Sequence, residues 1–389
     1  MLAITNGTVH TLAGAIHDHG TILIDAGKIM AVGERLTVPA DATVVDVAGK
    51  VVLPGFVESH SHVGVWSDGV AGEGHDFNET SDPVTPHMRA IDGINPGDGA
   101  FREVLVAGIT TLMTGSGSAN LFGGEWVALK PVGMIVEEMV LRYPCGLKLA
   151  LGENPKRVYG AQKKSPVTRM GEAALIRETF LKAQVYAAKL DRAAKAGDDA
   201  PERDLRLEPL VRAMRGEEKT RIHAHAAQDI VTAVRLAREF GLDVVIEHAT
   251  EGWKIADILA RENVPVSLGP FHLGRPKIEM ASMTLEAPGI LARAGVTVAI
   301  HMDATSATSY LPVFAGLAVR AGLDETEALK AITINAARIS GIADRVGSLE
   351  PGKDADVLVL SGHPFDWRTT VERVYINGQL AHAAAGIVA

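Results

Sequence analysis

The chain has 389 residues, of which 47% are hydrophobic and 22% charged, and its formal net charge is −9. This length allows a large hydrophobic core and more than one domain. Without a basic patch interleaved with aromatic residues, we expect no nucleic-acid partner. The single cysteine, Cys145, excludes an intrachain disulfide framework. Because no stretch reaches membrane-spanning length and no signal sequence opens the chain, we expect a cytoplasmic protein with no membrane partner.

Both ends of the chain have the pattern of short strands separated by turns. Strands are predicted at residues 2–9, 20–33 (two strands around an Ala26-Gly27 turn), 43–50, 357–360 and 373–378. No helix of useful length fits before residue 54. We therefore predict that residues 1–53 and 345–389 together form one small β-sandwich domain, and that residues 54–344 form a separate domain.

The middle of the chain alternates short apolar runs with amphipathic helices, which predicts βα units and a parallel sheet. Strands are predicted at residues 51–62, 108–113, 146–151, 220–223, 243–248, 266–268 and 296–300, with an eighth near 132–140. Helices are predicted at residues 171–195, 229–240, 252–262 and 284–294. Eight strands with intervening helices predict the α/β class and a (β/α)8 TIM-type barrel. A doubly wound open sheet is the alternative, although no Gly-x-Gly-x-x-Gly follows a first strand.

Two histidines one residue apart end the first of these apolar runs. In an extended strand the side chains of residues i and i+2 point to the same side, so His60 and His62 can present two imidazoles to one point. Imidazole is a good ligand for Zn and similar divalent metals. The alternative is a pair of surface or capping histidines.

Further ligand types recur where later apolar runs end. His223 and His248 end two strands, and Asp303 follows a third by a few residues. The ends of barrel strands meet on one face, so these side chains can surround one metal ion or a pair. A lone histidine at a strand end is more often structural, but the set as a whole predicts a metal site.

Lys148 lies inside an alternating run in which leucines occupy positions 147, 149 and 151. The leucine face should pack on the helices, which would point Lys148 into the barrel, where an unpaired charge is costly. Carboxylation by CO2 would turn the amine into an anion that bridges two cations. An ordinary salt bridge to Glu153 or Asp303 is one alternative, and Glu153 as the bridging carboxylate is another.

Two long segments with little periodicity, residues 63–99 and 152–169, follow strand ends, where barrel enzymes build their sites. From these segments and other loops, the candidate substrate-binding residues are Arg89, Tyr159, Arg169, His225 and His272. Several positive groups would suit a small-molecule substrate that bears a carboxylate.

The segment Pro54-Gly55-Phe56-Val57-Glu58-Ser59-His60-Ser61-His62, together with His223, His248 and Asp303, resembles the amidohydrolase superfamily. The closing segment from Gly347 to Val357 is similar to it as well. Within the superfamily, the chain is most similar to the branch of imidazolonepropionases and prolidase-like dipeptidases. Glu58 stands where the family usually has Asp.

The resemblance implies a role for each of these residues. His60 and His62 would bind one metal and His223 and His248 the other, with carboxylated Lys148 as the bridge. Asp303 would touch the first metal and take a proton from the bridging water. In members with a single metal, His60, His62, His223 and Asp303 bind it and His248 acts as acid and base. The cofactor would be one or two divalent ions, Zn foremost, with Mn, Fe or Co as alternatives.

Three functions are compatible with these residues. The first is a metal-dependent hydrolase that attacks a C–N bond (amide, cyclic amide or dipeptide) through a metal-activated hydroxide, with Asp303 as general base and acid. The second is a deaminase of an amino-heterocycle on the same scaffold. The third is a non-catalytic, amidohydrolase-like assembly protein. A homo-oligomer is compatible with all three.

Overall fold

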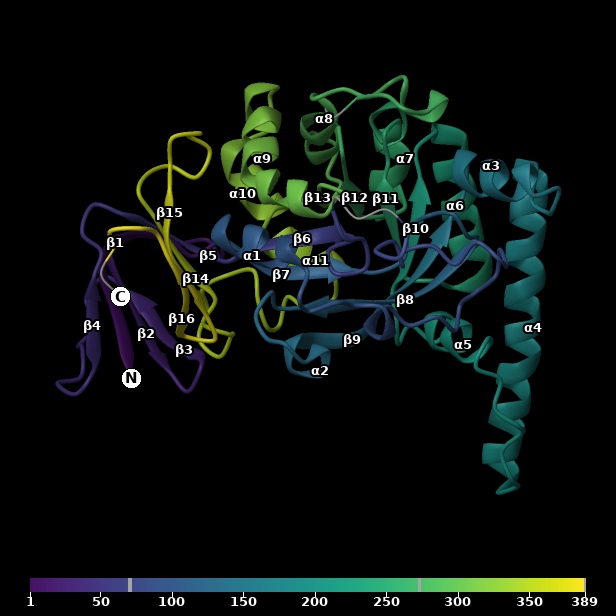
Figure 1. Cartoon of the computed structure of the whole chain (residues 1–389), viewed down its shortest axis with the longest axis horizontal. Helices are drawn as coiled ribbons and strands as arrows, with labels where there is room; N and C mark the ends of the chain where they lie inside the picture. Colours follow the sequence, from purple (N-terminus) through teal and green to yellow (C-terminus); the bar gives the residue numbers. More distant parts are fainter. Residues whose placement is uncertain (69–71, 272–273, 388–389) are drawn as a thin grey trace.

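The computed structural model describes residues 1–68, 72–271 and 274–387. Two sheets organise these residues, one built from both ends of the chain and one from its middle (Figure 1). None of the helices in the described part is long and apolar enough to cross a membrane.

The sheet of the termini has the strand order β16-β15-β14-β5-β1-β2-β3, and β4 pairs with β1 on the side of this path. Its strands are β1 (Leu2–His10), β2 (Ile16–Asp25), β3 (Lys28–Gly33), β4 (Thr43–Asp46), β5 (Val51–Pro54), β14 (Val357–Leu360), β15 (Val371–Ile376) and β16 (Gln379–Ala383). Because β5 pairs with β14, strands from both ends of the chain form one sheet around a small core, as predicted. The domain boundaries stay a prediction.

The second sheet has the order β13-β12-β11-β10-β9-β8-β7-β6. Its strands are β6 (Phe56–Ser61), β7 (Ile109–Thr114), β8 (Phe122–Leu129), β9 (Val140–Ala150), β10 (Thr220–Ala224), β11 (Val244–His248), β12 (Val266–Leu268) and β13 (Val298–Ile300). The backbone N–H of Asp303 donates to the carbonyl oxygen of His60 at 3.1 Å, and that of His62 donates to Ala304 at 3.0 Å. These bonds bring the two edges of the sheet together, so the TIM-type barrel is confirmed and the open sheet is wrong.

The prediction of the eighth strand was wrong. Residues 132–140 hold the short helix α2 (Val136–Met139) and only the first residue of β9. The missing strand is β8, which runs antiparallel to both β7 and β9. It was missed because the next strand, β9, follows β8 without the long helix that marks a βα unit.

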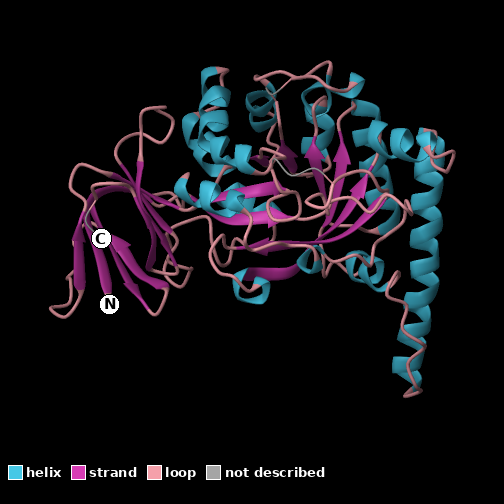
Figure 2. Cartoon of the chain, in the orientation of Figure 1, coloured by secondary structure: helices cyan, strands magenta, loops and turns pink. Residues whose placement is uncertain are grey.

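Helices cover the outside of the barrel (Figure 2). They are α1 (Gly99–Val106), α3 (Glu153–Ala161), α4 (Arg169–Ala196), α5 (Glu208–Met214), α6 (Ala227–Phe240), α7 (Ala256–Arg261), α8 (Ala287–Arg293), α9 (Leu311–Arg320), α10 (Glu325–Ala331) and α11 (Ile334–Ile339). The 3-10 helices are η1 (Ala90–Asp92), η2 (Gly252–Ile255), η3 (Ile278–Met280) and η4 (Ser306–Tyr310). Residues 152–169, predicted as a loop, contain α3, whose start follows β9 at once.

Side chains of the barrel strands contribute to two separate hydrophobic clusters. Trp126, Cys145, Val245 and Ala299 belong to one of them with residues of α11. The leucines at 147, 149 and 151 belong instead to the large core shared with α4, as predicted. A Cβ atom at Gly55 would lie 1.9 Å from Thr110 Oγ1, so only glycine lets the chain pass from β5 into β6 beside β7.

Candidate metal centre

The first group of ligand-type side chains combines the two ends of the barrel sheet. His60 is in β6 and His62 follows it, while Asp303 follows β13. Asp303 Oδ1 lies 3.1 Å from His62 Nε2 and 3.4 Å from His60 Nε2. Burial opposes ionisation of Asp303, but contacts with His60 and His62 hold its pKa well below the ordinary value. Asp303 is therefore a carboxylate held against two imidazoles.

The distal nitrogens of these imidazoles are held by neighbours. The Nδ1–H group of His62 donates to the Gly115 carbonyl oxygen at 2.8 Å, and that of His60 donates to Glu247 at 2.6 Å. A proton on Nδ1 leaves the Nε2 lone pair of each ring for a metal.

Glu247 is itself fixed by a buried cation. Arg221 Nη2 lies 2.7 Å from Glu247 Oε1 and donates to the Ser59 carbonyl oxygen at 2.5 Å. Burial raises the pKa of Glu247, but Arg221 and His60 outweigh it and lower the pKa to about 2. His60 is thus oriented by an ionised carboxylate.

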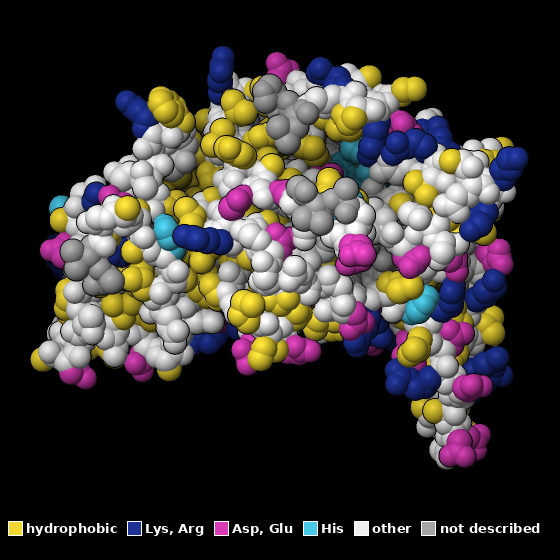
Figure 3. Space-filling model, in the orientation of Figure 1, with side chains coloured by type: hydrophobic (Ala, Val, Ile, Leu, Met, Phe, Trp, Pro, Cys, Tyr) yellow, Lys and Arg dark blue, Asp and Glu magenta, His cyan; other side chains and the backbone are white. Residues whose placement is uncertain are grey.

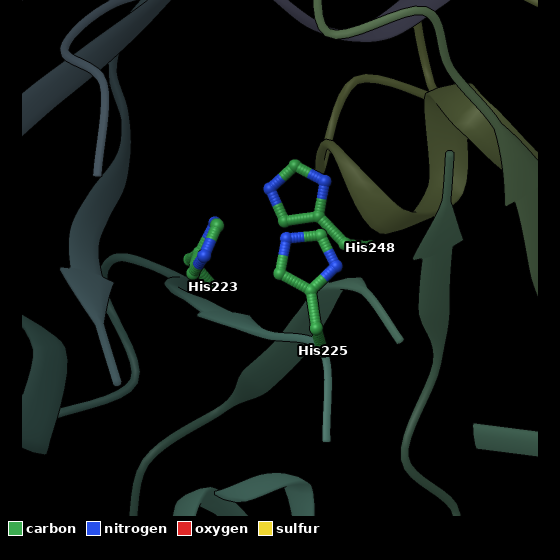
Figure 4. A group of neighbouring side chains, drawn as sticks. All are labelled: His223, His225 and His248. Atoms are coloured by element: carbon green, nitrogen blue, oxygen red, sulfur yellow. The ribbon is translucent and has the colours of Figure 1, made fainter. Parts of the chain in front are cut away.

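The second group consists of His223 and His225, from the end of β10, and His248, the last residue of β11 (Figure 4). Figure 4 shows the His225 and His248 rings stacked, with His223 beside them. The ring centroids of His225 and His248 are 4.7 Å apart. The His248 Nδ1–H group donates to the Gly269 carbonyl oxygen at 2.7 Å. Burial lowers the pKa of all three imidazoles, for His225 to about 3, so they are neutral.

Two of the ligand-type residues have a strained backbone. His248 has φ of 69° and Asp303 has φ of 51°, the left-handed region that non-glycine residues rarely adopt. Such strain persists only where the surroundings enforce it, and it is concentrated at functional sites.

Lys148 is fully buried on β9, and its Nζ atom lies 4.7 Å from the centre of the Trp126 ring. Among the described residues, Nζ has no hydrogen-bond partner. Burial lowers the pKa of this amine to about 8, against the field of Glu247 and Asp303. The alternative bridging residue, Glu153, begins α3, and its backbone N–H donates to Glu279 Oε2 at 2.9 Å.

The donor set tests whether a metal fits here. Within the described part of the chain, His223 Nδ1, His225 Nε2 and Lys148 Nζ are buried and lack a hydrogen-bond partner. Unsatisfied buried polar atoms are costly and rare in proteins. The ligand atoms of His223, His225 and His248 lie within 4.8 Å of one another, as do those of His60, His62 and Asp303. Both groups fit a divalent cation.

The predicted substrate-binding residues have varied positions. His225 lies in the second histidine group. Arg169 is paired with Asp229 at 2.7 Å, and the Tyr159 hydroxyl donates to Asn120 at 2.6 Å. Arg89 is exposed and makes two bonds to Asp92. His272 lies outside the described residues.

Several residues of the centre escaped the sequence analysis. They are Trp126, Arg221, Glu247, Glu279 and His301, of which His301 stacks on His60 at 4.6 Å between ring centres. Glu247 and His301 had a signal, since Glu247 immediately precedes the predicted ligand His248 and His301 follows β13 two residues before Asp303. Trp126 belongs to the strand that was missed, and Glu279 belongs to a 3-10 helix that no periodicity marks.

Known proteins share this architecture. A model of the amidohydrolase family matches residues 204–381. The crystal structure of an amidohydrolase from Thermotoga maritima MSB8 is 44% identical, with 99% of this chain and 100% of that chain covered and a TM-score of 0.95. The imidazolonepropionase of Deinococcus radiodurans is 29% identical, with 94% of this chain and 93% of that protein covered.

Another relative is longer than this chain. The amidohydrolase tasK of Hapsidospora irregularis is 29% identical over 92% of this chain, which spans 39% of the length of that protein. The sequence similarity, the barrel fold and the ligand-type residues at the strand ends all indicate the same family. The chain therefore belongs to the amidohydrolase superfamily, and it is a metal-dependent hydrolase.

Proposed function

We propose that the protein hydrolyses a C–N bond of a small amide, cyclic amide or dipeptide, with two divalent ions at this centre. The observation that carries this proposal is the pair of ligand groups, His60, His62 and Asp303 in one and His223, His225 and His248 in the other, with the buried Lys148 Nζ, which has no hydrogen-bond partner in the described part of the chain. His60 and His62 would hold one ion, and His223 and His248 the other. Carboxylated Lys148 would join them.

The ring nitrogens available for binding follow from their hydrogen bonds. His60, His62 and His248 each donate through Nδ1, which leaves Nε2 for the metal. For His223, Nδ1 is the atom without a partner in the described structure, while Nε2 is 3.5 Å from Asn154 Nδ2. We therefore assign Nδ1 of His223 as its metal-binding atom.

Divalent ions at such a site lower the pKa of water and polarise a carbonyl group. Asp303 is ionised and in contact with the first pair of imidazoles, so it can accept a proton from the attacking water. The same carboxyl group can then pass that proton to the leaving nitrogen. The lowered pKa of Asp303 keeps its side chain in the carboxylate form.

The Lys148 bridge has support of its own. The amine needs to be neutral to react with CO2, and burial favours the neutral form. Its position on β9 brings it level with Arg221 of β10, the strand that carries His223. Intact mass and a high-resolution map of protein prepared under CO2 should show the added carboxylate. Plain amine density in a fully metallated site would reject the bridge.

A substrate screen tests the function. Purified protein with a measured metal content is offered N-acyl amino acids, dipeptides and cyclic amides, and release of the amine or acid is measured. Amino-heterocycles form the second arm, in which ammonia is measured. Release of ammonia alone would replace the proposal by deamination, the alternative on this scaffold. Less than one metal equivalent, with no gain of activity on added Zn or Mn, would contradict both.

A further inference from the structure

The helix α4 extends beyond the barrel that its first half covers. It has 28 residues, and its buried ones are Glu172, Ile176, Phe180, Ala183 and Tyr186. In this helix, which is described over its whole length, no residue after Tyr186 is buried. The C-terminal part of α4 projects past the other elements of the barrel (Figure 1, Figure 2). Residues 187–196 therefore pack little against the rest of the chain.

A projecting helix of this kind needs a source of stability. Short helices are marginal in water on their own, and in proteins most of their stability comes from packing an apolar face. The Thr168 side chain caps the start of α4, and Gly197 ends it in the left-handed conformation with φ of +72°. These caps fix where the helix begins and ends, but they bury none of residues 187–196. A contact with another molecule would supply that burial.

The face of α4 that points away from the barrel has a regular pattern. Its exposed positions are alternately four and three residues apart, and they are Ala174, Glu178, Leu181, Val185, Ala188, Arg192 and Lys195. This is the heptad spacing of helices that pack side by side. Leu181 and Val185, at the middle of the pattern, are 54% and 58% exposed. We call these seven positions the outer stripe of α4.

Opposite charges lie on the two sides of this apolar middle. Glu178 lies before it, whereas Arg192 and Lys195 lie after it. Glu178 is paired at 2.6 Å with the exposed Lys182 of the same helix, and such surface pairs contribute little to stability. The Arg192 Nε–H group donates to the Ala188 carbonyl oxygen of its own helix at 3.2 Å. Figure 3 shows the projection clear of the body of the molecule, with side chains of both charges along it.

This order of charges makes the outer stripe complementary to a second copy of itself. In an antiparallel pair about a two-fold axis near Val185, Leu181 and Val185 meet the same apolar residues of the second copy. Glu178 then faces the second copy's Arg192. A parallel pair would instead place Glu178 against Glu178 and Arg192 against Arg192, which is unfavourable. The charges therefore select the antiparallel arrangement.

The same arrangement gives each projecting end a surface to pack on. With the axis near Val185, residues 187–196 of one copy lie along the first half of α4 in the other copy. A contact of this kind is isologous, so it closes as a dimer and leaves no unpaired stripe.

We propose that the outer stripe of α4 is a self-association surface through which two copies of this chain form an antiparallel, two-fold dimer. The inference is independent of the proposed reaction, because it rests on the exposure, spacing and charges of α4 alone. None of the outer-stripe residues belongs to the two ligand groups of the candidate metal centre.

The mass in solution tests the proposal. The metal-loaded wild type is measured by sedimentation velocity and light scattering from nanomolar to micromolar concentration, and a particle of two chains is expected. Val185→Glu places a carboxylate next to its own copy at the two-fold axis and should weaken the dimer at least about 100-fold. Met134→Glu is the matched control, because Met134 is 74% exposed before α2 and lies outside the stripe, so the dimer should persist.

Charge reversal tests the direction of the pair. Glu178→Lys and Arg192→Glu each place like charges opposite one another, and each should weaken the dimer about tenfold. The double variant restores opposite charges across the pair and should regain most of the wild-type affinity. Circular dichroism and thermal unfolding of each variant establish that the fold is retained, as expected for substitutions at exposed positions.

Three outcomes would overturn the inference. A wild type that is monomeric at micromolar concentration would leave this face to another protein or to a membrane surface. A dimer that Val185→Glu does not weaken would have its contact elsewhere on the molecule. A double charge reversal that fails to restore the dimer would exclude the antiparallel pair. Because the measured quantity is mass, each result stands whether or not the proposed C–N hydrolysis is correct.

Discussion

The two halves of the candidate metal centre differ in how their imidazoles are held. In the half made by His60 and His62, each Nδ1–H group is bonded, and one of the acceptors is backed by a buried arginine. In the half made by His223, His225 and His248, the Nδ1 atoms of His225 and His248 are the ring nitrogens with a partner closer than 3 Å among the residues that the structure describes. Within the described structure, His223 Nδ1 and His225 Nε2 have none.

This difference indicates two ways to build a ligand set. The first half is organised by the fold before a metal arrives, because hydrogen bonds from distant strands orient the rings. The second half leaves buried nitrogens unsatisfied, and a bound metal or substrate removes that cost. Four experiments test the contrast, and we take them in order of expected effect.

The largest effect is expected at Asp303, which connects the halves through its 4.0 Å contact with His248. Asp303→Asn keeps the shape of the side chain and removes the proposed proton acceptor. Turnover on whichever substrate the screen identifies should fall by about 10³-fold, or ~4 kcal/mol, with little change in metal content. Steady-state kinetics and metal analysis of the same sample check this. Near-normal turnover would exclude Asp303 as the base.

The next effect is on stability, through the buried pair behind His60. Arg221→Met leaves the Glu247 carboxylate without its cation in a fully buried site. Breaking a buried pair in this way should cost about 3 kcal/mol of unfolding free energy. Denaturant unfolding measures it, and Arg203→Met, which breaks an exposed pair with Glu208, is the matched control and should change the unfolding free energy far less.

A second variant decides the cause of that loss. Adding Glu247→Gln to Arg221→Met removes the stranded charge, so part of the stability should return. If the double variant is as unstable as the sum of the single ones, the loss comes from packing against Trp126 instead, since Arg221 lies 5.5 Å from the centre of that ring.

Removal of the metal should affect the second half more than the first. With free metal at about 100 times Kd, the bound ion contributes ~2.7 kcal/mol, which chelation removes. Hydrogen exchange should then accelerate at the ends of β10 and β11 and remain slower at β6, where the backbone N–H of His60 donates to Glu58 at 2.8 Å. Equal acceleration in all three strands would contradict the contrast between the halves.

The smallest effect is expected at Gly152, between β9 and α3. Its φ is +97°, and a Cβ atom there would lie 2.7 Å from Glu279 Oε2. Gly152→Ala should lower stability by ~2 kcal/mol, from backbone strain and from displacement of Glu279. Gly197→Ala is the control, because Gly197 has φ of +72° with nothing within 4 Å of the added atom. A thermal shift no larger than that of the control would show that Glu279 moves freely.

Local pattern was enough to predict the barrel and the residues at its strand ends. The shared direction of His60 and His62 depends only on the two-residue period of a strand. The meeting of His223, His248 and Asp303 with them depends only on parallel strands ending on the same face of a barrel. The antiparallel β8 broke that regularity, and its inward-facing Trp126 was missed with it. α3 was missed because its nine residues start immediately after a strand, inside a polar segment.

The sequence by itself determined which ligand types end the strands, because that information lies within a few neighbouring residues. Only the tertiary structure decided which nitrogen of each imidazole is free and which cations are already paired. Glu247 is 187 residues from His60, and Asp229 is 60 residues from Arg169. Hydrogen bonds over such separations depend on how the strands and helices pack, so the chain pattern could suggest Arg169 for a substrate while the fold pairs it with Asp229.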